Sequence, residues 1–231
     1  MKMRNKQGGF TLVEIAIVLV IVGLLLAGVL KGQELIENSR IKSIANEMKS
    51  VQAAYNGYVD RYKAIPGDET NLTMNARGWA ASAGAGGGDA SGVLNILVAE
   101  TFTNGGEQRA FWRALRASGL FAGDATGALG VAGLPRHSGG GLIGVVADPA
   151  GIYGRPGLAV CVSGLSTKQA AGLDILLDGA LPANNIGNNL GAARAQTNVL
   201  NPFAPIPGAP AGLVYSETAT LTPWTLCTTI G

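Results

Sequence analysis

The first 62 residues carry two hydrophobic patterns in succession. Residues 10–30 are apolar except for Thr11 and Glu14. At a rise of 1.5 Å per residue, a helix over this run would be roughly 30 Å long, which matches the hydrocarbon core of a bilayer. From Ile36 to Tyr62 the apolar residues recur mostly three or four positions apart, with charged residues between them. This spacing is typical of an amphipathic helix, so we predict one long helix through both patterns.

The predicted helix ends before Ile65-Pro66-Gly67-Asp68. Proline disfavours helical backbone at the residue before it, and Pro-Gly is a turn signal. The amphipathic half could dock on a sheet or pair with another helix in a coiled coil. Its apolar spacing is too irregular for clean heptads, which favours docking on a sheet.

Beyond Pro66 the chain is rich in glycine and its apolar segments are short. Residues 141–147, 158–162, 212–216 and 224–229 are apolar or β-branched and bounded by turn residues, which predicts four strands. The fold class predicted is α+β: a long N-terminal helix packed on a small antiparallel β-sheet head with additional short helices.

Two short helices are predicted in this head. Residues 106–118 form an amphipathic pattern with Phe111, Trp112 and Leu115 on the inward face. A second helix is predicted from a Ser166 cap to about Asp178, with a glycine following it.

The chain begins with a basic leader. Residues 1–9 contain Lys2, Arg4 and Lys6 and no acidic residue. A secretory signal peptide has its small-residue cleavage site after the apolar run, whereas the pair Gly8-Gly9 precedes it here. Cleavage after Gly9 would remove the basic residues and keep the helix. By the positive-inside rule the leader would stay cytoplasmic, and the chain after Lys31 would lie across the membrane.

Glu14 is a carboxylate within the apolar run. At the centre of a membrane-spanning helix such a group costs about 2.5–3.5 kcal/mol on insertion scales. One interpretation is a tolerated acid that stays partly hydrated near the interface. The other is that cleavage after Gly9 creates an α-amino group at Phe10, which neutralises Glu14 of a neighbouring subunit. Such a pair in a medium of low dielectric constant would set the axial register between subunits.

The run GFTLVE at residues 9–14, followed by IAIVLVIVGLLLAG, resembles the N-terminal signal of type IV pilins and type II secretion pseudopilins. The resemblance implies cleavage between Gly9 and Phe10 by a prepilin peptidase, N-methylation of Phe10, and a register role for Glu14. Many family members have a proline where Lys31 stands, so the resemblance does not extend to a kink at this position. Gly23, Gly28 and Gly32 could supply flexibility instead.

The resemblance also implies an organisation and a set of partners. Residues 1–9 would be a cleaved leader, 10–31 a transmembrane and filament-core helix, 32–65 its amphipathic continuation, and 66–231 a periplasmic globular head. The partners implied are the same or homologous pilin-like subunits in a helical filament, prepilin peptidase, an inner-membrane assembly platform, and inner-membrane lipid before assembly. The chain would reside in the inner membrane as a single-pass protein, or in a filament in the periplasm or at the cell surface.

Three functions compete at this point. The first is a structural subunit of a type IV pilus-like filament or of a type II secretion pseudopilus. The second is a minor tip pilin whose head binds DNA, a surface or a secreted substrate. The third is a single-pass membrane protein unrelated to filaments.

Composition argues against other classes. The formal net charge is +2 and charged residues make up 14% of the chain, which gives no strong field to attract nucleic acid. Arg109, Arg113 and Arg116 are expected to form a solvated helix face rather than a patch for DNA or another acidic partner. His137, the single histidine, has no identifiable aspartate or nucleophile partner, and no cofactor fingerprint is present, so an enzyme is not predicted.

Two further pairs of residues are candidate sites. Cys161 and Cys227 lie in two predicted strands. In an exported head they would form a disulfide, the alternative being two buried thiols. Asp174 and Asp178 are four residues apart and could contribute to a calcium site, as certain pseudopilin heads bind calcium in a C-terminal loop. The ligand loop is not recognisable, so no cofactor is predicted.

Overall fold

The computed structural model describes residues 11–79, 87–103, 105–126, 130–149, 151–153, 155–179, 186–187, 191–197, 215–216 and 223–230. Its contacts divide the chain into two compact units, Met1–Ser39 and Arg40–Gly231. This is a division by packing, and the predicted four-part organisation by leader, membrane segment, continuation and head stays a prediction.

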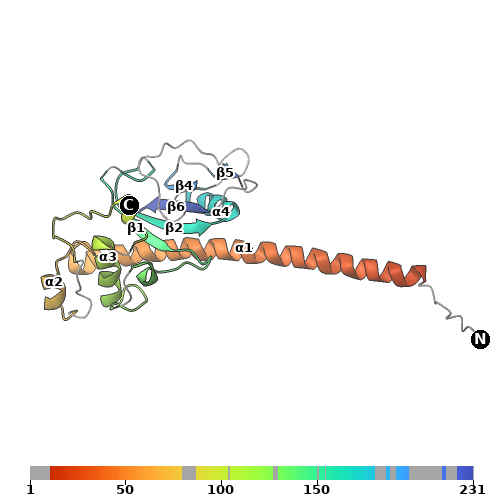
Figure 1. Cartoon of the computed structure of the whole chain (residues 1–231), viewed down its shortest axis with the longest axis horizontal. Helices are drawn as coiled ribbons and strands as arrows, with labels where there is room; N and C mark the ends of the chain where they lie inside the picture. The colour runs from red at the N-terminus through yellow and green to blue at the C-terminus, as the bar shows by residue number, and fades with distance from the viewer. Residues whose placement is uncertain are drawn as a thin grey trace, which may run out of the picture. The chain divides into compact units, whose positions relative to one another are not determined.

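The helix α1 (Leu12–Tyr62) runs without interruption through the apolar and the amphipathic patterns (Figure 1). Its apolar part is long and hydrophobic enough to cross a membrane, and that stretch is not buried against other parts of the molecule. Leu24, for example, is 71% exposed. The helix also continues through Lys31, whose ammonium pairs with Glu34 at 2.8 Å.

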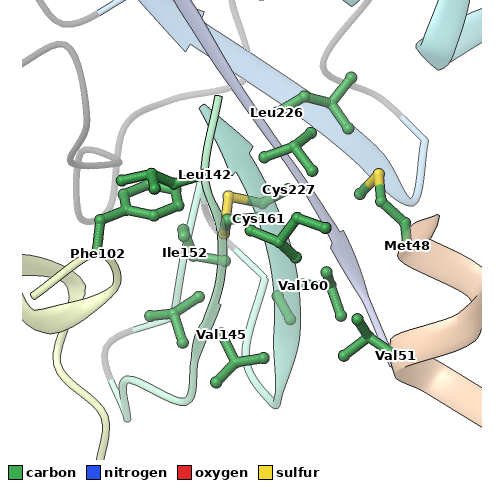
Figure 2. Close-up of a cluster of buried hydrophobic side chains, with 14 of the residues drawn as sticks. Met48, Val51, Phe102, Leu142, Val145, Ile152, Val160, Cys161, Leu226 and Cys227 are labelled. Atoms are coloured by element: carbon green, nitrogen blue, oxygen red, sulfur yellow. A yellow bond between two sulfur atoms is a disulfide. The ribbon is translucent and has the colours of Figure 1, made fainter. Parts of the chain in front are cut away.

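In the second unit, α1 supplies one wall of the hydrophobic core. Its buried residues are Ile41, Ile44, Ala45, Met48, Val51, Ala54 and Tyr58. Figure 2 shows Met48 and Val51 on the side of α1 that faces the sheet, near Val160 and Leu226. The amphipathic stripe therefore docks on a sheet, as its irregular spacing indicated.

The sheet has four antiparallel strands in the order β1-β2-β6-β4. These are β1 (Ile143–Val146), β2 (Ala159–Leu165), β6 (Trp224–Thr229) and β4 (Ala193–Thr197). Three of them coincide with predicted strands. Of the fourth predicted strand, residues 212–216, the structure describes the end, which is the strand β5 (Tyr215–Ser216) and pairs with β3 (Ile186–Gly187) in a separate two-stranded sheet. The strand that completes the main sheet, β4, was missed.

The remaining elements are short helices. They are α2 (Asn71–Ala76), η1 (Val98–Glu100), α3 (Gly106–Ala117), η2 (Gly130–Gly133) and α4 (Thr167–Asp178). The predicted cap of α4 is confirmed, because the Ser166 side chain accepts from the Gln169 N–H and the Gln169 side chain accepts from the Ser166 N–H. Phe111, Trp112 and Leu115 of α3 are fully buried, as predicted.

The expectation for the arginines of α3 was wrong. Arg113 is only 9% exposed. Arg116 is partly buried and donates to the Gly133 carbonyl oxygen at 2.9 Å. Burial lowers the pKa of both guanidinium groups, with the like charge of Arg109 adding to the effect at Arg113. This side of the helix is therefore largely covered.

A disulfide joins Cys161 to Cys227, which lie directly opposite each other on the adjacent strands β2 and β6 (Figure 2). Both residues are buried in the core between α1 and the loop that carries Phe102. The bridge closes a long loop, because the two residues are 66 positions apart. It thereby ties the C-terminal strand to the middle of the chain.

Replacing both cysteines by alanine should lower the free energy of unfolding by about 4 kcal/mol in the chain-entropy model. The double variant avoids leaving a reactive single thiol. Urea unfolding of the full chain in a fixed detergent measures the difference against the unreduced wild type. A difference below about 1 kcal/mol would show that the bridge does not restrict the unfolded chain as this model requires.

His137 is buried where the loop before β1 meets α1 and β2. Its Nε2 lies 2.8 Å from the Ser163 carbonyl oxygen, and its Nδ1 accepts from the Gly139 N–H at 3.1 Å. The next residue, Ser138, donates its N–H to the Glu47 carboxylate on α1, 3.0 Å from Oε2. Nδ1 is thus an acceptor and Nε2 carries the proton, so the neutral ring satisfies both contacts. Burial lowers the pKa of His137, against the opposing effects of the Ser163 carbonyl and Glu47.

Because the folded-state pKa of His137 is lowered, the unfolded chain binds a proton first as the pH falls below about 6.5. Stability should therefore be full above that pH and decline below it, with a slope of at most about 1.4 kcal/mol per pH unit from this group. Urea unfolding between pH 5 and 8, compared with His137→Gln, isolates the contribution. Identical slopes for the two proteins would contradict it.

Candidate functional site: the start of the long helix

The polar residues Thr11 and Glu14 lie at the N-terminal end of the apolar run, where α1 begins. Thr11 precedes the helix, and its carbonyl oxygen accepts the first helical bond from the Ile15 N–H at 3.4 Å. Glu14 is the third residue inside the helix. Gly9 and Phe10, the predicted processing residues, lie outside the described residues.

Thr11 and Glu14 form a reciprocal cap. The Glu14 N–H donates to Thr11 Oγ1 at 3.3 Å, and the Thr11 N–H donates to Glu14 Oε2 at 2.8 Å. The Thr11 hydroxyl also donates to Oε2 at 2.8 Å. This is the capping box of a Thr-x-x-Glu sequence, which satisfies backbone N–H groups that a helix start leaves without partners. The cap fixes where the helix begins and holds the carboxylate against the backbone N–H and hydroxyl of Thr11.

The carboxylate is the single formal charge between residues 11 and 30. Both of its described bonds go to Oε2. Its neighbours along the chain are exposed apolar side chains, with Leu12 91% and Val13 66% exposed. The position near the positive end of the helix dipole also favours a negative charge. The site can therefore hold an anion in an apolar setting and still offer an oxygen to a cation that approaches from the N-terminal side.

The capping role of Thr11 was missed in the sequence, where Thr11 counted only as a polar exception. The signal was present, because Thr-x-x-Glu before an apolar run is the pattern of a capping box. Recognising it would have placed the helix start and given Glu14 a partner in its own chain.

The other predicted site residues lie elsewhere, in the second unit. Asp178 accepts backbone N–H groups from Ala192 and Ala193 at 3.0 and 2.9 Å, so it anchors the start of β4. Asp174 is only 3% exposed. Among the described residues, the acidic groups close enough to share an ion are instead Asp68, Asp89 and Glu107. Asp174 and Asp178 do not belong to this described group, so the calcium site there remains a prediction.

His137 does not form a catalytic arrangement within the described residues. Its ring contacts are the Ser163 carbonyl oxygen and the Gly139 N–H, both backbone groups. The Ser163 hydroxyl instead accepts from the Leu142 N–H at 3.1 Å. The residue therefore holds a loop in place.

Comparison with known proteins points to the same N-terminal segment. Residues 4–30 match the family model described as the prokaryotic N-terminal methylation motif. This motif is the signal of type IV pilins and pseudopilins. It implies processing by prepilin peptidase and assembly with pilin-like subunits, and with the long apolar helix it fits single-pass membrane anchoring. No match was found to a curated protein or to a solved structure.

Replacing Thr11 by valine keeps the shape of the side chain and removes the hydroxyl of the cap. It should destabilise the first turn by about 1 kcal/mol, whereas Thr11→Ser should be close to wild type. Amide hydrogen exchange of the full chain in detergent micelles should then be about fivefold faster at Glu14 in the valine variant. Equal protection in the valine and serine variants would contradict the capping role.

Proposed function

We propose that the chain is a structural subunit of a type IV pilus-like filament or of a type II secretion pseudopilus. Its role is assembly rather than catalysis. The observation that carries the proposal is a single carboxylate, Glu14, held at the start of an exposed apolar helix within the residues that match the methylation motif.

The first step is processing. Cleavage between Gly9 and Phe10 removes Lys2, Arg4 and Lys6 and leaves the helix in the membrane. It also creates an α-amino group one residue before Thr11. N-methylation keeps this amine basic, so it stays a cation at neutral pH.

In the second step the processed subunit resides in the membrane before assembly. The apolar run of α1 lies in lipid, and the basic leader places the remainder of the chain on the opposite, periplasmic side. A disulfide between Cys161 and Cys227 suits such an oxidising compartment. The Thr11 cap gives Glu14 two hydrogen bonds in this state, which lowers the cost of a carboxylate in an apolar medium.

The third step is assembly. Apolar side chains that face lipid exchange those contacts for packing against the helices of neighbouring subunits. The Phe10 amine of one subunit then meets the Glu14 carboxylate of the next. An ion pair in a medium of low dielectric constant loses much of its interaction energy when either partner is misplaced. It therefore selects one axial register between subunits.

Glu14→Gln tests this proposal because it removes the charge and keeps the size and the cap acceptor. The variant should be cleaved and methylated normally, as shown by N-terminal mass analysis, but should be depleted at least about tenfold from sheared filaments. Glu34→Gln is the matched control, since it removes an exposed acid from the same helix beyond the apolar run. Normal incorporation of the Glu14 variant would contradict the register role.

A further inference from the structure

The second unit contains a hollow of about 380 Å³ that opens to solvent. Its described lining comes from five separate stretches of the chain, and most of the lining residues are apolar. The apolar lining residues are Tyr55, Ile65, Val93, Leu94, Ala147, Pro149 and Leu158. The volume lies within the range of sites that hold a small ligand or a few side chains of a partner.

One wall of the hollow carries an exposed apolar side chain. Val93 lines it and is 56% exposed. Outside α1, the described large apolar residues that are exposed are Val93, Leu97, Leu72 and Leu176, and Val93 is the one among them that lines the hollow. An exposed apolar group beside an apolar hollow is typical of a surface that binds a partner.

Carboxylates accept hydrogen bonds from backbone N–H groups of the residues that line the hollow. The Gly92 N–H donates to Asp68 Oδ2 at 3.0 Å, and the Asn95 N–H donates to Glu107 Oε2 at 2.5 Å. Both of these donors are lining residues, as is Asp148. Asp89 lies close as well, because carboxylate oxygens of Asp68, Asp89 and Glu107 are all within 4.8 Å of one another. The apolar hollow is thus bordered by four acids.

The described charges that act on Glu107 are those of other carboxylates, Asp89 and Asp68. The described lining includes no lysine or arginine, and the sequence contains none between Arg77 and Arg109. Among the bases near the lining residues in sequence, Arg77 pairs with Glu69, Lys63 pairs with Asp60 at 2.9 Å, and Arg155 donates to the Gly191 carbonyl oxygen at 3.1 Å. Burial raises the pKa of Glu107, and the charges of Asp89 and Asp68 add to the rise. The border therefore carries a negative charge that a cation would relieve.

We propose that this hollow is the docking site for a cationic segment of a partner protein, which inserts an apolar side chain beside an arginine or lysine. The apolar walls receive the side chain, and the carboxylates of Glu107 and Asp89 attract the flanking positive charge. Complementary charge of this kind steers the partner and fixes its orientation. The inference does not depend on filament assembly, since it rests on residues of the second unit alone.

The test uses the full-length chain in detergent micelles with methyl-labelled isoleucine, leucine and valine. The probe is the amidated tripeptide Arg-Phe-Arg, compared with Glu-Phe-Glu, Arg-Gly-Arg and Gly-Phe-Gly. Arg-Phe-Arg should shift the methyl signals of Ile65, Val93, Leu94 and Leu158, and the other three peptides should bind at least about threefold more weakly. Raising the salt concentration should weaken Arg-Phe-Arg binding.

Two variants separate the apolar and the charged contributions. Val93→Gln removes an exposed wall residue, with Leu72→Gln as the control, because Leu72 is exposed and apolar but lies outside the lining. Glu107→Gln removes a charge and keeps the acceptor for Asn95, with the exposed Asp60→Asn as its control. Each test variant should weaken Arg-Phe-Arg binding about threefold or more, and the controls should not.

Several outcomes would overturn the proposal. Binding of Gly-Phe-Gly or Glu-Phe-Glu as tight as that of Arg-Phe-Arg would show that the charge is not recognised. Methyl shifts that appear with protein concentration alone would show that a second copy fills the hollow. Shifts confined to other parts of the chain, or none, would show that the hollow is not a docking site for such a segment.

Discussion

Assembly of this chain, as proposed, depends on one carboxylate in an apolar segment. Glu14 has no charged partner within residues 11–30, and an unpaired charge in hydrocarbon is costly. The Thr11 cap supplies hydrogen bonds but no positive charge, so it reduces this cost without removing it. A cation from outside the segment would remove it, and in the proposed function the amine created by cleavage before Phe10 supplies one. Under that proposal, the same group that is expensive in lipid becomes favourable in a filament.

In the second unit, packing against the sheet stabilises the C-terminal half of α1. Ile44, Met48 and Val51 of α1 pack against a sheet whose central strands are joined by the Cys161–Cys227 bridge. Packing of an amphipathic face provides most of the stability of such a helix in proteins. Residues 11–30 of the described chain are in contrast all exposed, with their apolar side chains available for lipid or for other helices.

Several elements of the fold were predictable because their sequence signals lie within a few neighbouring residues. The helical spacing through Tyr62 and the Pro66-Gly67 turn located the end of α1. Ser166 fixed the start of α4 because its capping pattern is self-contained. The strand β4 (ARAQT) was not predictable in the same way, since it lacks β-branched residues apart from Thr197 and takes its position from pairing with β6. Burial of Arg113 was missed because residue type says little about which side of a helix later segments will cover.

The central claim is most directly tested by solid-state NMR on filaments assembled from two subunit populations. One population carries ¹⁵N-phenylalanine, whose α-amine signal is separate from amide signals, and the other carries glutamate labelled with ¹³C at Cδ. The account predicts a dipolar coupling between the Phe10 amine and Glu14 Cδ of a different subunit, corresponding to a separation of about 4 Å. A mixed filament in which this amine shows no coupling to any carboxylate of the other population would contradict it.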